Sequence, residues 1–257
     1  MSLHNLSRFG LLTRETTLIL QNLEKNIQFN NVEFKLYESG YTSSKSHATR
    51  IKSEIKRRIN LKKDFLPEIN SLITMANTNF NSIVKGQIYF VYLYNTDTFV
   101  SHITDKLGEI FHSNYDNPEI SRNTIKNLLM THLNSISIEG QNKTIENWIG
   151  KYLSIMREIN ILIRKRKHDY FINFYAIMPE TWYFFILDSY FKSYSLFKSE
   201  FFKSFQIEPS TIPNLLQNLE NTNSKTNRMM IHTQLVNNSI KIETSFNSIQ
   251  EWIVNVK

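Results

Sequence analysis

The sequence contains no cysteine, which excludes disulfide bonds, thiolate zinc sites and cysteine nucleophiles and indicates a reducing compartment. Glycine and proline are scarce as well, at 6 and 5 of 257 residues, so long regular elements are expected. Because 41% of the residues are hydrophobic, the chain can bury a sizeable core. These features predict a mainly α, multihelical fold.

Long hydrophobic runs are also missing. No window approaches the roughly 18 apolar residues that mark a membrane-spanning helix, and the richest run, Trp182 to Leu187, ends at Asp188. The first twelve residues lack the apolar segment of a signal peptide. We therefore expect a soluble, cytoplasmic protein without a membrane partner.

Common catalytic and phosphate-binding motifs are absent: there is no Gly-rich phosphate loop, no His-Glu-x-x-His and no Gly-x-Ser-x-Gly. The nearest approach to a metal site is Glu109 and His112, which lie with His102 and Asp105 on one face of a predicted helix. Di-iron carboxylate bundles need a second Glu-x-x-His pair, and the sequence has no other. We predict that the protein is not an enzyme and has no metal or other cofactor.

The positive charge of the chain is concentrated between Ser43 and Lys63. This stretch holds eight basic residues and one acid, Glu54, and its net charge of +7 equals that of the whole chain. The remaining residues carry equal numbers of basic and acidic side chains. A local excess of this size indicates a surface that meets an anionic partner.

The same stretch predicts a helix at about 44–60. Its apolar residues recur every three or four positions and give one narrow stripe, Ala48, Ile51, Ile55 and Ile59. The preceding hydroxyl residues Thr42, Ser43 and Ser44 are all suitable N-caps. The opposite face combines small hydroxyl residues with two arginines seven positions apart: Ser46, Arg50, Ser53 and Arg57, flanked by Thr49 and Lys56.

A helix face of this composition suits the major groove of DNA. Small residues permit close approach, and arginine can bind guanine through two hydrogen bonds, while the surrounding basic residues would reach phosphates. The DNA-contacting residues predicted in this stretch are Lys45, Ser46, Thr49, Arg50, Lys52, Ser53, Lys56, Arg57, Arg58, Lys62 and Lys63. The alternative is the solvated basic face of an ordinary surface helix.

The residues before this helix suggest a helix-turn-helix. Asn30 or Asn31 can cap a short helix that ends near Ser39, and Gly40 follows as a left-handed C-cap. An earlier helix at about 14–26 would complete a three-helix unit. The second helix of such a motif enters the DNA groove, although helical hairpins with glycine turns are also common in proteins that do not bind DNA.

The rest of the chain predicts a second helical unit. The polar run at 77–79 separates an N-terminal helical domain, 1–78, from a C-terminal helical domain, 79–257, with a buried central helix at 83–94. Further helices are predicted near 97–112, 121–136, 143–163, 209–219 and 247–254. A β-hairpin is predicted from strands at 229–236 and 239–244 around Asn237-Asn238, and residues 170–177 alternate like a short strand.

A second basic cluster, Arg164, Lys165, Arg166 and Lys167, is expected at the C-terminus of the 143–163 helix. Cations are favourable there because of the helix dipole. Phosphate contact is the alternative role, and these four residues are included among the DNA-binding candidates.

Aromatic residues are concentrated from Tyr170 to Phe205, which holds 15 of the 33 in the chain. They could form a stacking surface for single-stranded nucleic acid. Their helical spacing favours a packed core instead.

In its order of segments the chain resembles the BrxA family of bacterial BREX phage-defence systems. The resemblance is spread over most of the chain. It includes Gly10-Leu11-Leu12 before a helix, the basic helix from Thr42-Ser43-Ser44 to Arg58-Ile59, the 83–94 and 97–112 pair, the 143–163 helix with its basic end, and the late hairpin followed by Ser245-Phe246-Asn247-Ser248-Ile249.

The resemblance implies a mostly helical protein of two subdomains, with a NusB-like overall likeness and helix-turn-helix elements. It also implies a protein that binds double-stranded DNA without catalysis, beside a BREX methyltransferase, a large ATPase, a phosphatase-like protein and a Lon-like protein. Two alternatives stay open: an adaptor that docks on other BREX components through the basic helix, and an RNA-binding protein.

Overall fold

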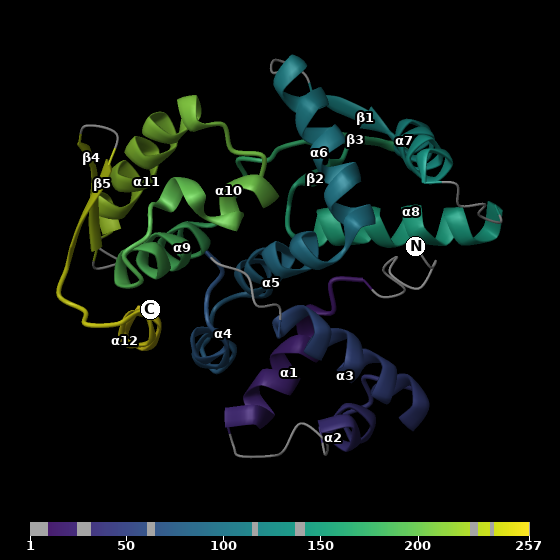
Figure 1. Ribbon diagram of the computed structural model, residues 1–257, viewed down its shortest axis with the longest axis horizontal. Coiled ribbons are helices and arrows are strands. Elements are labelled where there is room, and N and C mark those ends of the chain that lie inside the picture. The colour runs from purple at the N-terminus through teal and green to yellow at the C-terminus, as the bar shows by residue number, and fades with distance from the viewer. Residues whose placement is uncertain are drawn as a thin grey trace.

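The computed structural model describes residues 10–24, 32–60, 65–114, 118–136, 142–226, 231–236 and 239–256. Within them the helices are α1 (Thr13–Glu24), α2 (Val32–Glu38), α3 (Lys45–Ile59), α4 (Ile69–Ala76), α5 (Ser82–Thr96), α6 (Thr98–Ser113), α7 (Arg122–Ser135), α8 (Asn142–Glu158), α9 (Pro179–Phe191), α10 (Glu200–Ser204), α11 (Ile212–Thr226) and α12 (Ile249–Asn255), with short 3-10 turns η3 (Leu196–Lys198) and η4 (Pro209–Thr211). The strands are β1 (Glu119–Ser121), β2 (Leu162–Arg164), β3 (Asp169–Ile172), β4 (Ile231–Val236) and β5 (Ser239–Thr244). The predicted mainly α fold with a C-terminal β-hairpin is confirmed (Figure 1).

Helix α5 lies at the centre of the fold and is buried from Val84 to Leu93. It packs against α1, α3, α6, α9 and α10, which confirms the buried central helix predicted at 83–94. Its polar Gln87 is fully buried, and its Nε2 donates hydrogen bonds to the carbonyls of Ile159 and Ala176. Oε1 accepts two more hydrogen bonds from the start of α9. Because a buried amide with all these partners is costly to displace, Gln87 holds α8 and α9 against α5.

Helices α1, α2 and α3 form a three-helix unit below α5 in Figure 1. Gly40 turns the chain between α2 and α3 with a φ of 71°, a left-handed conformation that glycine adopts without strain. Across this turn the Tyr41 N–H donates to the Leu36 carbonyl at 3.1 Å. The predicted sequence of short helix, glycine turn and longer helix is therefore present. The predicted caps Asn30 and Asn31 lie outside the described residues.

The region between α8 and α9 differs from the prediction. Helix α8 ends at Glu158 rather than near residue 163, because Asn160 adopts a left-handed φ of 63° and the Ile161 N–H turns back to the Met156 carbonyl. The chain then forms β2 and β3, which join β1 in an antiparallel sheet of order β1-β3-β2. Only the part of this sheet near residue 170 had been predicted, as a short strand.

The aromatic stretch from Tyr170 to Phe205 is mainly core, as its spacing predicted. Trp182 to Leu187 are all buried, and Phe185 stacks on Phe201 with ring centroids 4.6 Å apart. Tyr190 and Phe197 are exceptions with exposed side chains. No helix in the described part of the chain is long and apolar enough to cross a membrane.

The C-terminal helix α12 packs against α4 and α9, which come much earlier in the sequence (Figure 1). Its Trp252 is fully buried. One connected hydrophobic core extends from Leu11 to Val256 and passes through the predicted boundary at 78/79 without interruption. The division into two domains at that boundary stays a prediction.

Candidate nucleic-acid interface

The predicted polar face of α3 is exposed to solvent. The apolar stripe is buried at Ala48, Ile51, Ile55 and Ile59, and the Ser44 side chain caps the helix by accepting from the His47 N–H at 3.2 Å. The opposite side presents the exposed residues Ser46, Thr49, Arg50, Ser53, Lys56 and Arg57. Lys45 and Lys52 lie nearer the apolar stripe, Lys45 exposed in the first turn and Lys52 half-buried. The geometry therefore leaves a basic surface with small residues between its cations. Lys62 and Lys63 lie outside the described residues.

Arg57 lies on this face, but its guanidinium is bound within the protein. Nε and Nη2 donate to the two carboxylate oxygens of Glu54 at 3.0 and 2.8 Å, and Nη1 donates to the Thr96 carbonyl at 2.9 Å. A two-point contact between arginine and a carboxylate is among the stronger charge-assisted pairs. The predicted role of Arg57 in reading bases would require breaking these bonds, so the structure favours a role in holding α3 against the end of α5.

Arg58 is only 4% exposed, and its predicted contact with phosphates is wrong. Nε donates to Glu54 Oε1 at 2.8 Å, and Nη1 donates to the carbonyls of Gly10 and Leu11 at 3.1 Å each. Burial lowers the pKa of Arg58, and the charge and hydrogen bond of Glu54 oppose this effect. Arg58 therefore joins α3 to the segment before α1. The sequence held a signal for this position, because at 100° per residue Arg58 falls beside Ile51 at the edge of the apolar stripe.

Glu54 is the acid that serves both arginines. Burial alone would raise the pKa of Glu54, but the hydrogen bond from Arg57 and the charges of Arg58 and Arg57 lower it below its usual value. Glu54 therefore stays ionised and cancels part of the positive charge of α3. The other basic residues of α3 are Lys45, Arg50 and Lys56, which are exposed, and Lys52, which is half-buried.

Asp97 connects this charge cluster to α6. Its Oδ1 caps the helix by accepting from the N–H groups of Phe99 and Val100, each at 3.1 Å. Its Oδ2 has no hydrogen-bond partner within the described residues. Burial raises the pKa of Asp97 from 3.8 to about 6, against the opposing effects of the Val100 hydrogen bond and of Arg58.

We expect Asp97→Asn to remove a pH dependence of stability. Between about pH 4 and pH 6 the folded state binds a proton at Asp97 that the unfolded state has released, so the wild-type free energy of unfolding falls as pH rises through this window. Asparagine also caps helices well. Urea denaturation at a series of pH values measures this. As pH rises through the window, the free energy of unfolding of the variant should increase relative to that of the wild type by roughly 1–3 kcal/mol. If the wild type instead became more stable relative to the variant as pH rises, the raised pKa of Asp97 would be contradicted.

The second basic cluster forms the tip of the β2–β3 hairpin, so its predicted place at a helix C-terminus is wrong. The Lys165 N–H donates to the Asp169 carbonyl at 3.0 Å, and the Arg164 guanidinium donates to the carbonyls of Arg166 and Lys167, each at 3.3 Å. Lys165 also pairs with Glu119 on β1. All four basic side chains are exposed. The helix dipole therefore does not explain them, and their role in binding an anion stays a prediction.

The two basic regions occupy different parts of the molecule. In Figure 1, α3 lies on one side of α8 and the sheet of β1, β2 and β3 lies on the other. We therefore treat the basic residues of α3 and those of the hairpin tip as two candidate sites.

The residues considered for a metal site have other partners. Asp105 Oδ1 accepts from the Tyr94 hydroxyl at 2.6 Å and from Gln206 at 2.9 Å. Glu109 pairs with Lys106. His102 stacks on His132 of α7 with ring centroids 4.0 Å apart. Among the described residues, no group of three or more His, Asp or Glu side chains is arranged to hold a metal ion.

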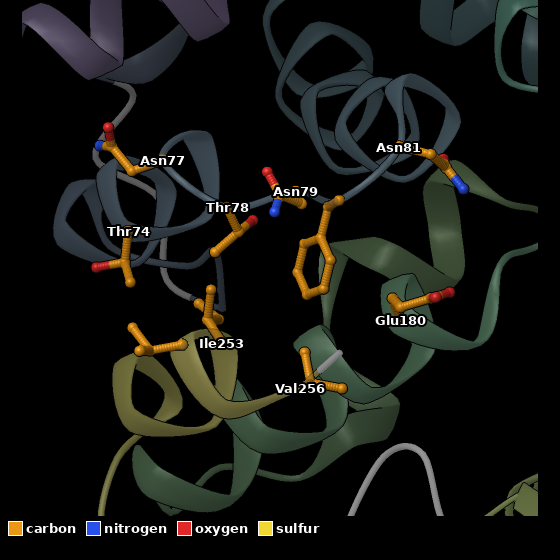
Figure 2. A pocket seen from close by; sticks show the side chains of 10 residues that line it. Thr74, Asn77, Thr78, Asn79, Asn81, Glu180, Ile253 and Val256 are labelled. Carbon is orange, nitrogen blue, oxygen red and sulfur yellow. The ribbon is translucent and has the colours of Figure 1, made fainter.

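A pocket of about 590 Å³ with a mixed polar and apolar lining lies between the α4–α5 connection, α12 and the start of α9. In Figure 2, Thr78 and Asn79 of the connection lie near Ile253 of α12 and near Val256, which follows this helix, while Glu180 lies on the right-hand side. From the sequence, residues 77–79 were predicted only to separate two domains. The polar part of its lining consists of Thr and Asn side chains and one carboxylate, Glu180.

No protein-family model, curated protein or solved structure matches the chain. The resemblance to the BrxA family and the NusB-like likeness therefore stay predictions from the sequence.

Proposed function

We propose that the protein is a non-enzymatic, cytoplasmic protein that binds double-stranded DNA through the exposed face of α3. The observation that supports this most directly is the composition of that face. Arg50 and Lys56 supply positive charge on this face, and Lys45 and Lys52 supply it at the margin. The exposed Ser46 and Ser53 flank Arg50 without bulk. Arg50 would approach base edges in the major groove, and the lysines would contact phosphates.

The attachment of α3 to the protein body supports the same proposal. A recognition helix must hold its side chains in a fixed orientation to bind a rigid duplex. Arg57 and Arg58 both fix the last turn of α3. The buried Arg58 is bound to Glu54 and to two backbone carbonyls, and Arg57 is bound to the end of α5. The helix thus presents its basic face on a rigid support.

The biological setting is proposed from the sequence resemblance alone. The order of segments resembles that of the BrxA family, and this resemblance supports a role in a BREX phage-resistance system beside its methyltransferase, ATPase, phosphatase-like and Lon-like components. In that setting α3 would bring the protein to duplex DNA while other surfaces remain accessible to these partners.

The proposal is tested by fluorescence anisotropy of a labelled duplex of about 20 base pairs, titrated with the protein over a salt series. The four basic residues of α3, with Lys62 and Lys63 after it, predict four to six neutralised phosphates and a log–log salt slope of about −4 to −5. A structured RNA competitor should displace the duplex poorly. Absence of binding at low salt would contradict the proposal and favour an adaptor role, and preferential displacement by RNA would favour RNA binding.

A further inference from the structure

The late hairpin ends in an unpaired strand edge. Within the described residues β5 has β4 as its one strand neighbour, while β4 also packs on α11. Figure 1 shows the hairpin at the margin of the molecule. An exposed edge of this kind offers backbone N–H and C=O groups to another strand.

The hairpin register identifies which residues offer these groups. Val236 and Ser239 pair across two intervening residues, and such a closing pair exchanges both backbone hydrogen bonds. The bonded pairs then alternate along the ladder, so Ser239, Lys241 and Glu243 bond to β4. The N–H and C=O groups of Ile240, Ile242 and Thr244 point away from β4 toward the open edge.

A partly apolar groove lies beside β5. Ile240 and Ile242, both half-buried, line a cavity of about 400 Å³ together with Tyr190 and Phe197 from α9 and η3. The Tyr190 and Phe197 side chains are 46% and 38% exposed, which is unusual in a chain whose other aromatic residues in this region are mainly core. A strand added to the edge of β5 would place its inward side chains over this groove.

The sequence of β5 is complementary to itself in one antiparallel register. With Ile242 on a two-fold axis, Ile242 lies opposite Ile242 of a second copy, Ile240 lies opposite Thr244, and Lys241 lies opposite Glu243. The residues with outward-pointing backbone groups then face one another, and the opposite charges meet twice by symmetry on the solvent side. The two adjacent two-fold registers instead place Lys241 against Lys241 or Glu243 against Glu243.

We propose that β5 pairs with β5 of a second copy of this chain. The pairing joins the two hairpins into a four-stranded antiparallel sheet and covers the groove at Tyr190 and Phe197. Lys241 and Glu243 already attract each other within one strand at 3.0 Å and are 61% and 65% exposed at the side chain, so both are accessible to a second copy. This inference does not depend on DNA binding.

The test is the monomer–dimer equilibrium of the full chain, measured by analytical ultracentrifugation at low salt. Lys241→Glu and Glu243→Lys each replace two attractive cross-strand pairs by two repulsive ones, and each should weaken dimerisation about tenfold or more. The double variant Lys241→Glu/Glu243→Lys restores opposite charges and should return the dimer to within about threefold of wild type. Lys143→Glu changes an exposed cation on α8, away from the hairpin, and is the matched control with little expected effect.

Each alternative outcome overturns the proposal. A wild-type chain that stays monomeric up to a few hundred micromolar would show that the edge does not pair with itself. A double variant as weak as the single variants would show that Lys241 and Glu243 do not meet across the interface. If Lys143→Glu weakened dimerisation as much as Lys241→Glu, the loss would follow from net charge in general and not from a contact across β5.

Discussion

Replacing both Arg50 and Lys56 by glutamate should lower the affinity for duplex DNA by about 100-fold or more at 0.1 M salt, because two phosphate or base contacts are lost and two repulsive charges are introduced. Both residues lie on the exposed face of α3. The log–log salt slope should become shallower by about two units, since fewer counterions are released on binding. The measurement is the same anisotropy titration over a salt series.

A matched control separates a local interface from a general effect of charge. Lys143→Glu/Lys198→Glu makes the same change in net charge at two exposed lysines on α8 and η3. This variant should bind within about threefold of wild type if α3 is the interface. Equal losses in both variants would contradict a localised contact, and retained affinity in the α3 variant would move the interface elsewhere, with the hairpin tip at Arg164 to Lys167 as the next surface to change.

The choice of Arg50 and Lys56 depends on the structure. From the sequence alone, Arg50 and Arg57 formed the natural pair, because they lie seven residues apart on one helix face. The structure retains Arg50 and shows the Arg57 guanidinium bound to Glu54 and to the Thr96 carbonyl. Loss of Arg57 would therefore change both the attachment of α3 and its charge, and a binding defect in that variant could not be assigned to DNA contact.

The helix itself was predictable because its information is local. Ala48, Ile51, Ile55 and Ile59 repeat at helical spacing, and the cap residue Ser44 precedes them. The partners of Arg58 were not predictable, because the carbonyls of Gly10 and Leu11 lie nearly fifty residues earlier in the chain. A helical pattern shows which side of a helix faces inward, but it does not show which backbone carbonyls that side will contact.

The misplaced basic cluster has a similar physical cause. Ile159, Leu162 and Ile163 continue the three- and four-residue spacing of Leu153 and Met156, so periodicity alone extends the helix. The chain leaves the helix because Asn160 takes a left-handed conformation and residues 162–164 pair with β3. That short strand pairs with β3, and β3 pairs in turn with β1, more than forty residues before β2 in the chain. Strands of three residues carry little local signal.

Arg58→Met should lower the free energy of unfolding by about 3–5 kcal/mol, the cost of removing one partner of a buried ion pair. The substitution leaves Glu54 without its buried arginine and removes the donor to the Gly10 and Leu11 carbonyls. Since a domain is typically stable by only about 5–15 kcal/mol, this is a severe loss. Urea denaturation followed by circular dichroism measures it. Arg57→Met removes the more exposed partner of Glu54 and, as the control, should cost about 1 kcal/mol.

The double variant Glu54→Gln/Arg58→Met distinguishes a buried structural pair from a DNA contact. Because glutamine carries no charge, the double variant should recover roughly half or more of the stability lost in Arg58→Met. Its duplex affinity, measured on the folded protein, should stay within about threefold of wild type, because Arg58 is buried and does not reach phosphates. A folded double variant with a tenfold loss of affinity and a salt slope shallower by one unit would instead place Arg58 at the DNA, and would contradict its assignment as the residue that anchors α3 to the protein body.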